Sequence, residues 1–179
     1  MSRARASRSC PACAHSAFDN WPRGSHPTHS CPAPGRSSAL ATSVLDMTEI
    51  QLLRPEGLIA SPAFSHVAIV PPGATTVYIG GQNAVDQNGE LVGGADVAAQ
   101  TRQVMANLVT ALAAAGAGIE HLVSVSVVLV EGADVQAAYA AAAPSLGSAK
   151  VPPLVNAALV SGLGVPGALV EVSAVAAVS

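Results

Sequence analysis

The side chains best suited to bind a metal lie within the first 31 residues. Cys10 and Cys13 are separated by two residues, and His26, His29 and Cys31 follow. Thiolates and imidazoles are the ligands that tetrahedral zinc takes in proteins, so these residues make a zinc site one hypothesis. The spacing of His29 and Cys31 is too tight for a common zinc finger, and no apolar pattern nearby predicts packing around a metal. We therefore expect no metal here.

A glycine pair is a second feature that raises a question about binding. The β-rich run Val77-Tyr78-Ile79 ends at Gly80-Gly81, and a polar stretch with Asn88-Gly89 as its turn follows. Without a side chain, glycine lets a ligand or another backbone approach closely, and it also suits a β-bulge. The pair predicts either the wall of a pocket or a plain bulge.

Glu171 stands between valines in a nearly uncharged C-terminal stretch. Strand alternation places it on the same face as Leu169 and Ser173, opposite Val170 and Val172. A carboxylate is costly to bury without a partner, which favours a cleft or the solvent-facing side of a strand.

The charge changes sign within the chain, which indicates two segments. The 179 residues carry a net charge of −3. Five arginines against two aspartates give +3 over residues 1–46, and three cations against nine carboxylates give −6 over residues 47–179. We place a domain at 47–179. Its negative charge and the chain's few aromatic residues argue against nucleic-acid binding.

Residues 1–46 are rich in Ser, Pro, Arg and Ala and have no hydrophobic period. This composition favours a disordered extension. The alternative is a start codon assigned too far upstream, with translation beginning at Met47. An organellar transit peptide stays open, but no amphipathic helix is evident, and a secretory signal is not expected without an apolar region. We expect a cytoplasmic protein.

A charge-free interval between Lys150 and Glu171 is about long enough to span a bilayer. It contains Pro152, Pro153 and Pro166 as well as three glycines, which a spanning helix would not tolerate without unpaired backbone groups. Two buried strands joined by a turn explain it better, and we expect no membrane segment.

The periodicity of residues 66–176 predicts an α+β fold in the order β-β-α-β-α-β-β, with both helices on one face of a sheet. Strands are expected at His66–Val70 and Thr75–Gly80 (paired as a hairpin), His121–Val130, Leu154–Val160 and Ala168–Ala176; helices are expected at Asp96–Ala115 and from Asp134 to a stop at Pro144. Residues 47–65 are expected to be extended or irregular. The face without helices carries almost no charge, so we expect other subunits to cover it.

Three stretches resemble the RidA (YjgF/YER057c-like) family across residues 47–179. These are Gly81-Gln82 in "YIGGQ", the helix with Gln100-Thr101-Arg102, and the closing Leu-Val-Glu-Val at 169–172. The resemblance implies a chorismate-mutase-like homotrimer with clefts between subunits. It also implies cofactor-free hydrolysis of enamines and imines such as 2-aminoacrylate to 2-keto acids and ammonia.

The resemblance implies that Glu171 is the family glutamate that positions or activates the attacking water. Gly81 matches the position whose backbone groups contact the substrate. Gly80 stands where active members often have Ser, and Phe64 replaces the tyrosine of the family's Pro-Tyr-Ser stretch. Tyr139 is a further candidate for the substrate pocket.

The arginine that would hold the substrate carboxylate is absent: Asn156 or Ala157 stands there, depending on the position of a one-residue gap. Loss of such a bidentate arginine–carboxylate interaction costs about 2–5 kcal/mol of binding free energy for an anionic ligand. Lys150 and Arg54 are the basic side chains outside the first helix; Arg102 is expected on that helix's surface.

Two functions follow. The first is a divergent family member whose intersubunit cleft binds a small, neutral or weakly polar metabolite, with little or no imine deaminase activity. The second is an active enamine/imine deaminase that uses Glu171 and recruits Lys150 or backbone donors for the carboxylate. An endoribonuclease activity fits poorly with a domain of charge −6.

Overall fold

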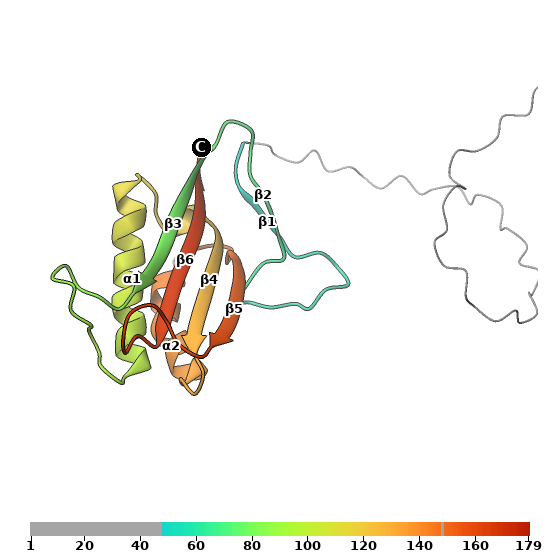
Figure 1. Cartoon of the computed structure of the whole chain (residues 1–179). Coiled ribbons are helices and arrows are strands. Elements are labelled where there is room, and N and C mark those ends of the chain that lie inside the picture. Colours follow the sequence, from blue (N-terminus) through green and yellow to red (C-terminus); the bar gives the residue numbers. More distant parts are fainter. Residues whose placement is uncertain (1–47, 148) are drawn as a thin grey trace, which may run out of the picture. The chain divides into compact units, whose positions relative to one another are not determined.

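The computed structural model describes residues 48–147 and 149–179, and it confirms the α+β class. A four-stranded mixed sheet has the order β3-β6-β4-β5, in which β4 and β5 are parallel and the other neighbours antiparallel. Helices α1 and α2 pack on one face of this sheet (Figure 1). The elements are β1 (Gln51–Leu53), β2 (Val67–Ile69), β3 (Thr75–Asn83), α1 (Val97–Ala114), the 3₁₀ turn η1 (Ile119–His121), β4 (Leu122–Val130), α2 (Val135–Leu146), β5 (Leu154–Val160) and β6 (Val170–Val178).

The expected hairpin between the first two predicted strands is wrong. β2 pairs with β1, a strand in the region expected to be irregular, and β3 pairs with β6. Alternation identifies a strand but not its partner, and β6 offers β3 a longer run of matching Val and Ala than β2 does. β3 also continues past Gly80 and Gly81 to Asn83, and its register with β6 shifts between Ile79 and Gln82. The glycine pair therefore forms a bulge in the strand.

The first helix is confirmed to within one residue at each end. The Asp96 side chain accepts hydrogen bonds from the backbone N–H groups of Ala98 and Ala99, as an N-cap aspartate should. At the other end Gly116 adopts a φ of +71°, and the N–H of Ala117 donates to the carbonyl of Leu112. This is the glycine-dependent way of ending a helix.

The second helix begins after Asp134 as predicted, but Pro144 does not stop it. α2 continues to Leu146, with Pro144 inside its last turn. Proline is most disruptive in a helix interior, where it removes a backbone hydrogen bond. Here the turn is closed beyond it by the N–H of Gly147, which donates to the carbonyl of Ala143 at 2.8 Å.

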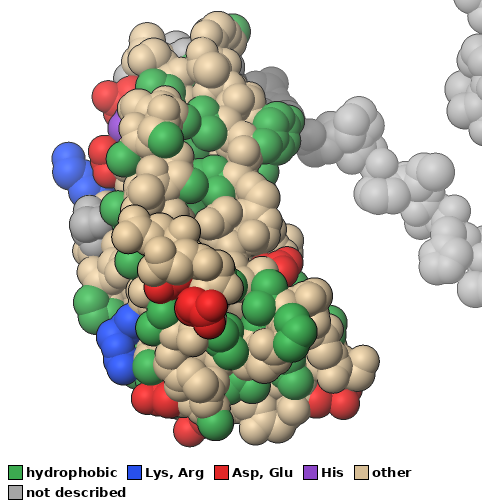
Figure 2. All heavy atoms as spheres, turned by 60° about the vertical axis from the view of Figure 1, so that its left-hand side comes forward, with side chains coloured by type: hydrophobic (Ala, Val, Ile, Leu, Met, Phe, Trp, Pro, Cys, Tyr) green, Lys and Arg blue, Asp and Glu red, His purple; other side chains and the backbone are tan. Residues whose placement is uncertain are grey.

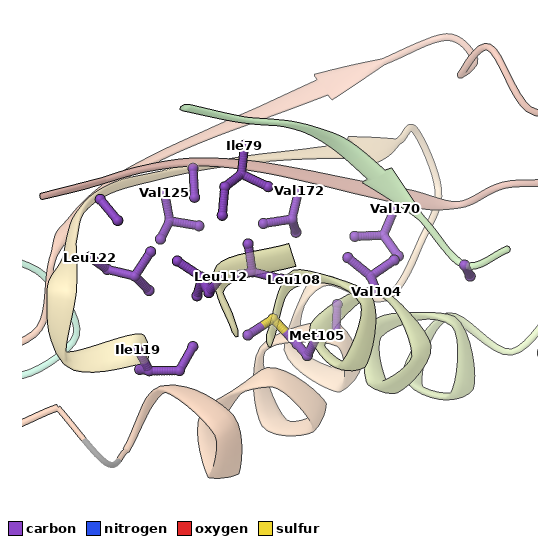
Figure 3. Packing of buried hydrophobic residues seen from close by; sticks show 14 of the residues in the cluster. Ile79, Val104, Met105, Leu108, Leu112, Ile119, Leu122, Val125, Val170 and Val172 are labelled. Atoms are coloured by element: carbon purple, nitrogen blue, oxygen red, sulfur yellow. The ribbon is translucent and has the colours of Figure 1, made fainter. Parts of the chain in front are cut away.

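Apolar side chains of α1 and the inner face of the sheet form the core (Figure 3). Leu108 and Leu112 are fully buried on α1 and point toward Val125 and Val172 on the central strands. β6 alternates as predicted, with Val170 and Val172 buried and Glu171 on the opposite side. Burial of such side chains, at roughly 1.5–3 kcal/mol each, is the main force that holds α1 on the sheet.

The interval between Lys150 and Glu171 forms two strands joined by a turn, as predicted. Its first strand is not buried, however: β5 is the edge of the sheet, and Asn156 to Leu159 are exposed. Among residues 48–147 and 149–179, no helix is long and apolar enough to cross a membrane.

Candidate functional site

Glu171 lies on the sheet face that the helices leave uncovered. In the strand register it stands between Asn83 of β3 and Val128 of β4. The side-chain Nδ2 of Asn83 donates a hydrogen bond of 3.0 Å to Glu171 Oε2. The carboxylate is partly buried, and one of its oxygens is thus held by an uncharged amide.

Gly81 lies directly against the same carboxylate. A Cβ atom at this position would be 2.5 Å from Glu171 Oε1, closer than non-bonded atoms approach, whereas a Cβ at Gly80 would meet nothing within 4 Å. The bulge therefore has a local purpose, since it gives the carboxylate room beside the backbone. Of the two glycines, only Gly81 is required by this contact.

Hydrogen bonds from α1 hold the end of β3, and with it Asn83, in place. Asn107 on α1 donates from Nδ2 to the backbone carbonyls of Asn83 at 2.9 Å and of Val85 at 2.8 Å. Gln103, one turn earlier, donates to Asn107 Oδ1 at 2.9 Å. The end of β3 is thereby tied to the helix, which fixes the backbone from which Asn83 reaches Glu171.

The sequence reasoning missed Asn83 and Asn107. A polar residue two places after a glycine pair, and an asparagine in the apolar stretch of a helix, are the signals that point to them. The Oδ1 atom of Asn83 is buried and has no hydrogen-bond partner among the described residues. Burial of an amide oxygen without a hydrogen-bond donor costs about 1–3 kcal/mol, so the position of Asn83 is maintained at some expense in stability.

The other predicted site residues do not gather at Glu171. Asn156 and Ala157 are successive residues of β5 and so point to opposite faces; Asn156 pairs with Ser126, on the face of Glu171. Phe64 contacts His66 edge-to-face at 5.3 Å between ring centroids, and His66 Nε2 hydrogen-bonds to the carbonyl of Ile59.

A shallow hollow of about 260 Å³ lies on the uncovered face of the sheet, next to the Glu171 row. Gly80, Tyr78 and three serines are among its lining residues: Ser124, Ser126 and Ser173. Tyr78 is 80% exposed, although it is a large aromatic residue in the middle of a strand. The described residues of this surface offer a ligand hydroxyl groups, backbone groups and apolar side chains, but no charge.

A separate hollow of about 400 Å³ contains Tyr139, Arg54 and Lys150. Both cations are exposed, and neither forms an ion pair with another described residue. Arg102 is exposed on α1, as predicted. Figure 2 shows one face of the molecule, on which charged side chains are separated by apolar and other uncharged surface.

One carboxyl group outside the site has a perturbed pKa. Backbone N–H donation from Glu90, and then from Asn88, lowers the pKa of Asp86 below its usual value of 3.8. These contacts organise the turn between β3 and α1, where Asp86 Oδ1 accepts from the N–H of Asn88 at 2.8 Å.

The zinc hypothesis concerned Cys10, Cys13, His26, His29 and Cys31, all of which lie outside the described residues. Within the part of the chain that the structure describes, no group of three His, Cys, Asp or Glu side chains is placed to hold a metal ion.

Comparison with known families decides where the chain belongs. The model of the family described as Endoribonuclease L-PSP matches residues 57–178. The chain belongs to this family. The resemblance to RidA is thereby confirmed, since solved structures of RidA and YjgF proteins are also similar to it.

Three solved structures of the RidA/L-PSP family illustrate the similarity. The Rid-family protein YyfB from Yersinia pestis, described as of unknown function, is 33% identical with a TM-score of 0.64, over 72% of this chain and 98% of its own. RidA from the Antarctic bacterium Psychrobacter sp. PAMC 21119 is 28% identical with a TM-score of 0.51, over 64% and 93%. The YjgF gene product of E. coli is 26% identical with a TM-score of 0.52, over 60% and 83%. A search of curated proteins gave no match.

Proposed function

We propose that this RidA/L-PSP protein forms a homotrimer and binds a small, neutral or weakly polar metabolite in a cleft between two subunits. Glu171, Gly81 and Asn83 form one wall of this cleft. The observation that carries the proposal is the partner of Glu171: its carboxylate is held by the amide of Asn83. The residues described at this wall provide acceptors and an amide but no cation, which suits a ligand that donates hydrogen bonds.

The uncovered sheet face supports the trimer. Glu171 is the one carboxylate or cation at the outward positions of its four strands, and Tyr78 is 80% exposed there. An uncharged face with an exposed aromatic residue is the kind of surface that a partner subunit buries. A cleft at its margin would leave Glu171 accessible at the edge of the interface.

The alternative is an enamine/imine deaminase in which Glu171 activates water. This function needs a group that holds the substrate carboxylate. Glu171 lies opposite Val128 of β4, which in turn lies opposite Ala158 of β5. Leu154, the first residue of β5, precedes Ala158 by four residues, which places it roughly 16 Å from Glu171 by strand geometry. Arg54 and Lys150 line a different hollow, to which Glu171 does not contribute. Backbone donors or a cation from a second subunit would therefore have to hold the substrate carboxylate.

A coupled assay separates the two functions. The full chain is mixed with 2-aminoacrylate generated in place by a serine lyase, and pyruvate release is compared with the uncatalysed rate. We expect no acceleration from protein that sedimentation shows to be a trimer. Acceleration that Glu171→Gln abolishes would establish the deaminase instead, and a monomer would overturn the intersubunit cleft.

Calorimetry tests the neutral ligand directly with a matched pair of probes. We expect 2-oxobutanamide to bind and the Glu171→Gln variant to lose at least about fivefold in affinity, because a charge-assisted hydrogen bond is lost. Weaker binding of 2-oxobutanamide than of 2-oxobutanoate at this wall would contradict the proposal.

An endoribonuclease activity, which the family description names, has less support. Affinity for RNA comes mainly from Lys and Arg contacts to phosphates, and residues 47–179 carry three cations against nine carboxylates.

A further inference from the structure

The hollow that contains Arg54 and Lys150 has features that the cleft at Glu171 does not explain. Its volume is about 400 Å³, and the described residues that line it include both cations but no carboxylate. Residues 47–179 contain only three Lys and Arg side chains in a segment of charge −6. Two of those three therefore line one hollow, although the domain as a whole is negatively charged.

The other described lining residues are apolar, apart from the hydroxyl of Tyr139. Tyr139, Ala143 and Leu146 come from one face of α2, at steps of four and three residues, and Pro62 and Pro152 complete the opposite side. Together they offer an apolar surface beside two positive charges. The phenolic hydroxyl of Tyr139 is an additional hydrogen-bond donor.

The two chain segments that carry the hollow are fastened together. The hydroxyl of Ser65, which is 3% exposed, donates to the carbonyl of Pro152 at 2.7 Å. The N–H of the same serine donates to the carbonyl of Pro153 at 3.0 Å. The segment before β2 is therefore held against the segment before β5, and the hollow is part of the folded architecture.

We propose that this hollow is a binding site for a small monocarboxylate with an apolar body, separate from the cleft at Glu171. Arg54 and Lys150 hold the carboxylate, since guanidinium and ammonium groups both donate to carboxylate oxygens. The apolar body lies against the α2 face formed by Tyr139, Ala143 and Leu146. The site does not depend on the function proposed for Glu171, because the two share no lining residue.

The test compares phenylacetate with phenylacetamide, which has the same shape and no charge, by calorimetry on the full chain. We expect phenylacetate to bind and phenylacetamide to bind at least about tenfold more weakly. The affinity for phenylacetate should fall by at least about fivefold in Arg54→Gln and in Lys150→Gln, and further as salt is raised. Arg102→Gln, which removes the third cation of the domain, is the matched control and should change nothing.

Three results would overturn this site. Equal binding of phenylacetamide would show that the two cations do not bind the ligand's carboxylate. Equally tight binding of inorganic phosphate, in competition with phenylacetate, would show that the apolar surface adds nothing. A loss of phenylacetate affinity in Glu171→Gln would show that the hollow and the Glu171 cleft are one site. Circular dichroism of each variant excludes unfolding as the cause.

Discussion

The carboxylate of Glu171 lies so close to the backbone of Gly81 that a side chain at position 81 would have to displace it. A Cβ at position 81 would stand 2.5 Å from Oε1, while the neighbouring Gly80 has open space. Asn83 holds the other carboxylate oxygen at 3.0 Å. The bulge in β3 and the glutamate on β6 thus form one unit, contributed by residues about 90 positions apart in the chain.

Gly81→Ala should displace the Glu171 side chain. We expect a loss of 2-oxobutanamide affinity similar to that of Glu171→Gln, with little change in stability, because the atoms in the way are the end of a flexible side chain. Gly80→Ala, which meets nothing within 4 Å, is the matched control. Calorimetry and chemical denaturation measure the two effects, and equal behaviour of the two variants would show that the contact has no consequence.

Asn107→Ala should destabilise the protein and loosen the end of β3. It removes two hydrogen bonds to carbonyls, which we expect to cost about 1–3 kcal/mol in the free energy of unfolding. Because those carbonyls belong to Asn83 and Val85, hydrogen exchange should also become faster there than in β4. Thr110→Ala on the exposed side of α1 is the control; uniform exchange rates would argue against a positioning role for Asn107.

Gln100 is a fully buried polar residue that should be essential for stability. Its amide donates to the carbonyls of Gly94 and Gly167, and its Oε1 accepts from the N–H of Leu169 at 2.7 Å. Gln100→Leu leaves those backbone groups unpaired, at an expected cost of about 2–5 kcal/mol. Gln136→Leu, on the exposed surface of α2, should stay within about 0.5 kcal/mol. A denaturation midpoint for Gln100→Leu near that of the unchanged protein would refute this expectation.

Leu108→Ala should create a cavity under the sheet and lower the free energy of unfolding by about 2.7–5 kcal/mol. Val109, the next residue of α1, is 43% exposed, and its replacement by Ala should cost well under half as much. Denaturant titration of both variants compares burial at adjacent positions of one helix. Similar losses would place the core on a different face of α1.

Asp86 should titrate below 3.8, the usual value for an aspartate. A lowered pKa in the folded state means that the ionised carboxylate stabilises the turn at higher pH, and this contribution is lost as pH falls through the folded pKa. NMR titration of the Asp86 carboxyl group measures the midpoint directly. A midpoint at or above 3.8 would mean that the hydrogen bonds from Glu90 and Asn88 do not form in solution.

The sequence by itself determined those helices and strands that a local pattern of residues specifies. Apolar residues recur every three or four positions, with Asp96 before them and Gly116 after them. This pattern specifies α1 to within one residue at each end. The outward direction of Glu171 also follows from the sequence, because alternation is a property of the strand itself. The limits of β5 agree with the predicted ones as well.

Only the tertiary structure decided which segments meet. Pairing of β2 with β1 and of β3 with β6 depends on competition among distant segments, which no local period records. For the same reason Asn83 and Asn107 escaped the sequence reasoning, although the glycine pair beside them did not. Arg54, Tyr139 and Lys150 came together at one hollow because packing of α2 and the anchored Ser65 placed them there.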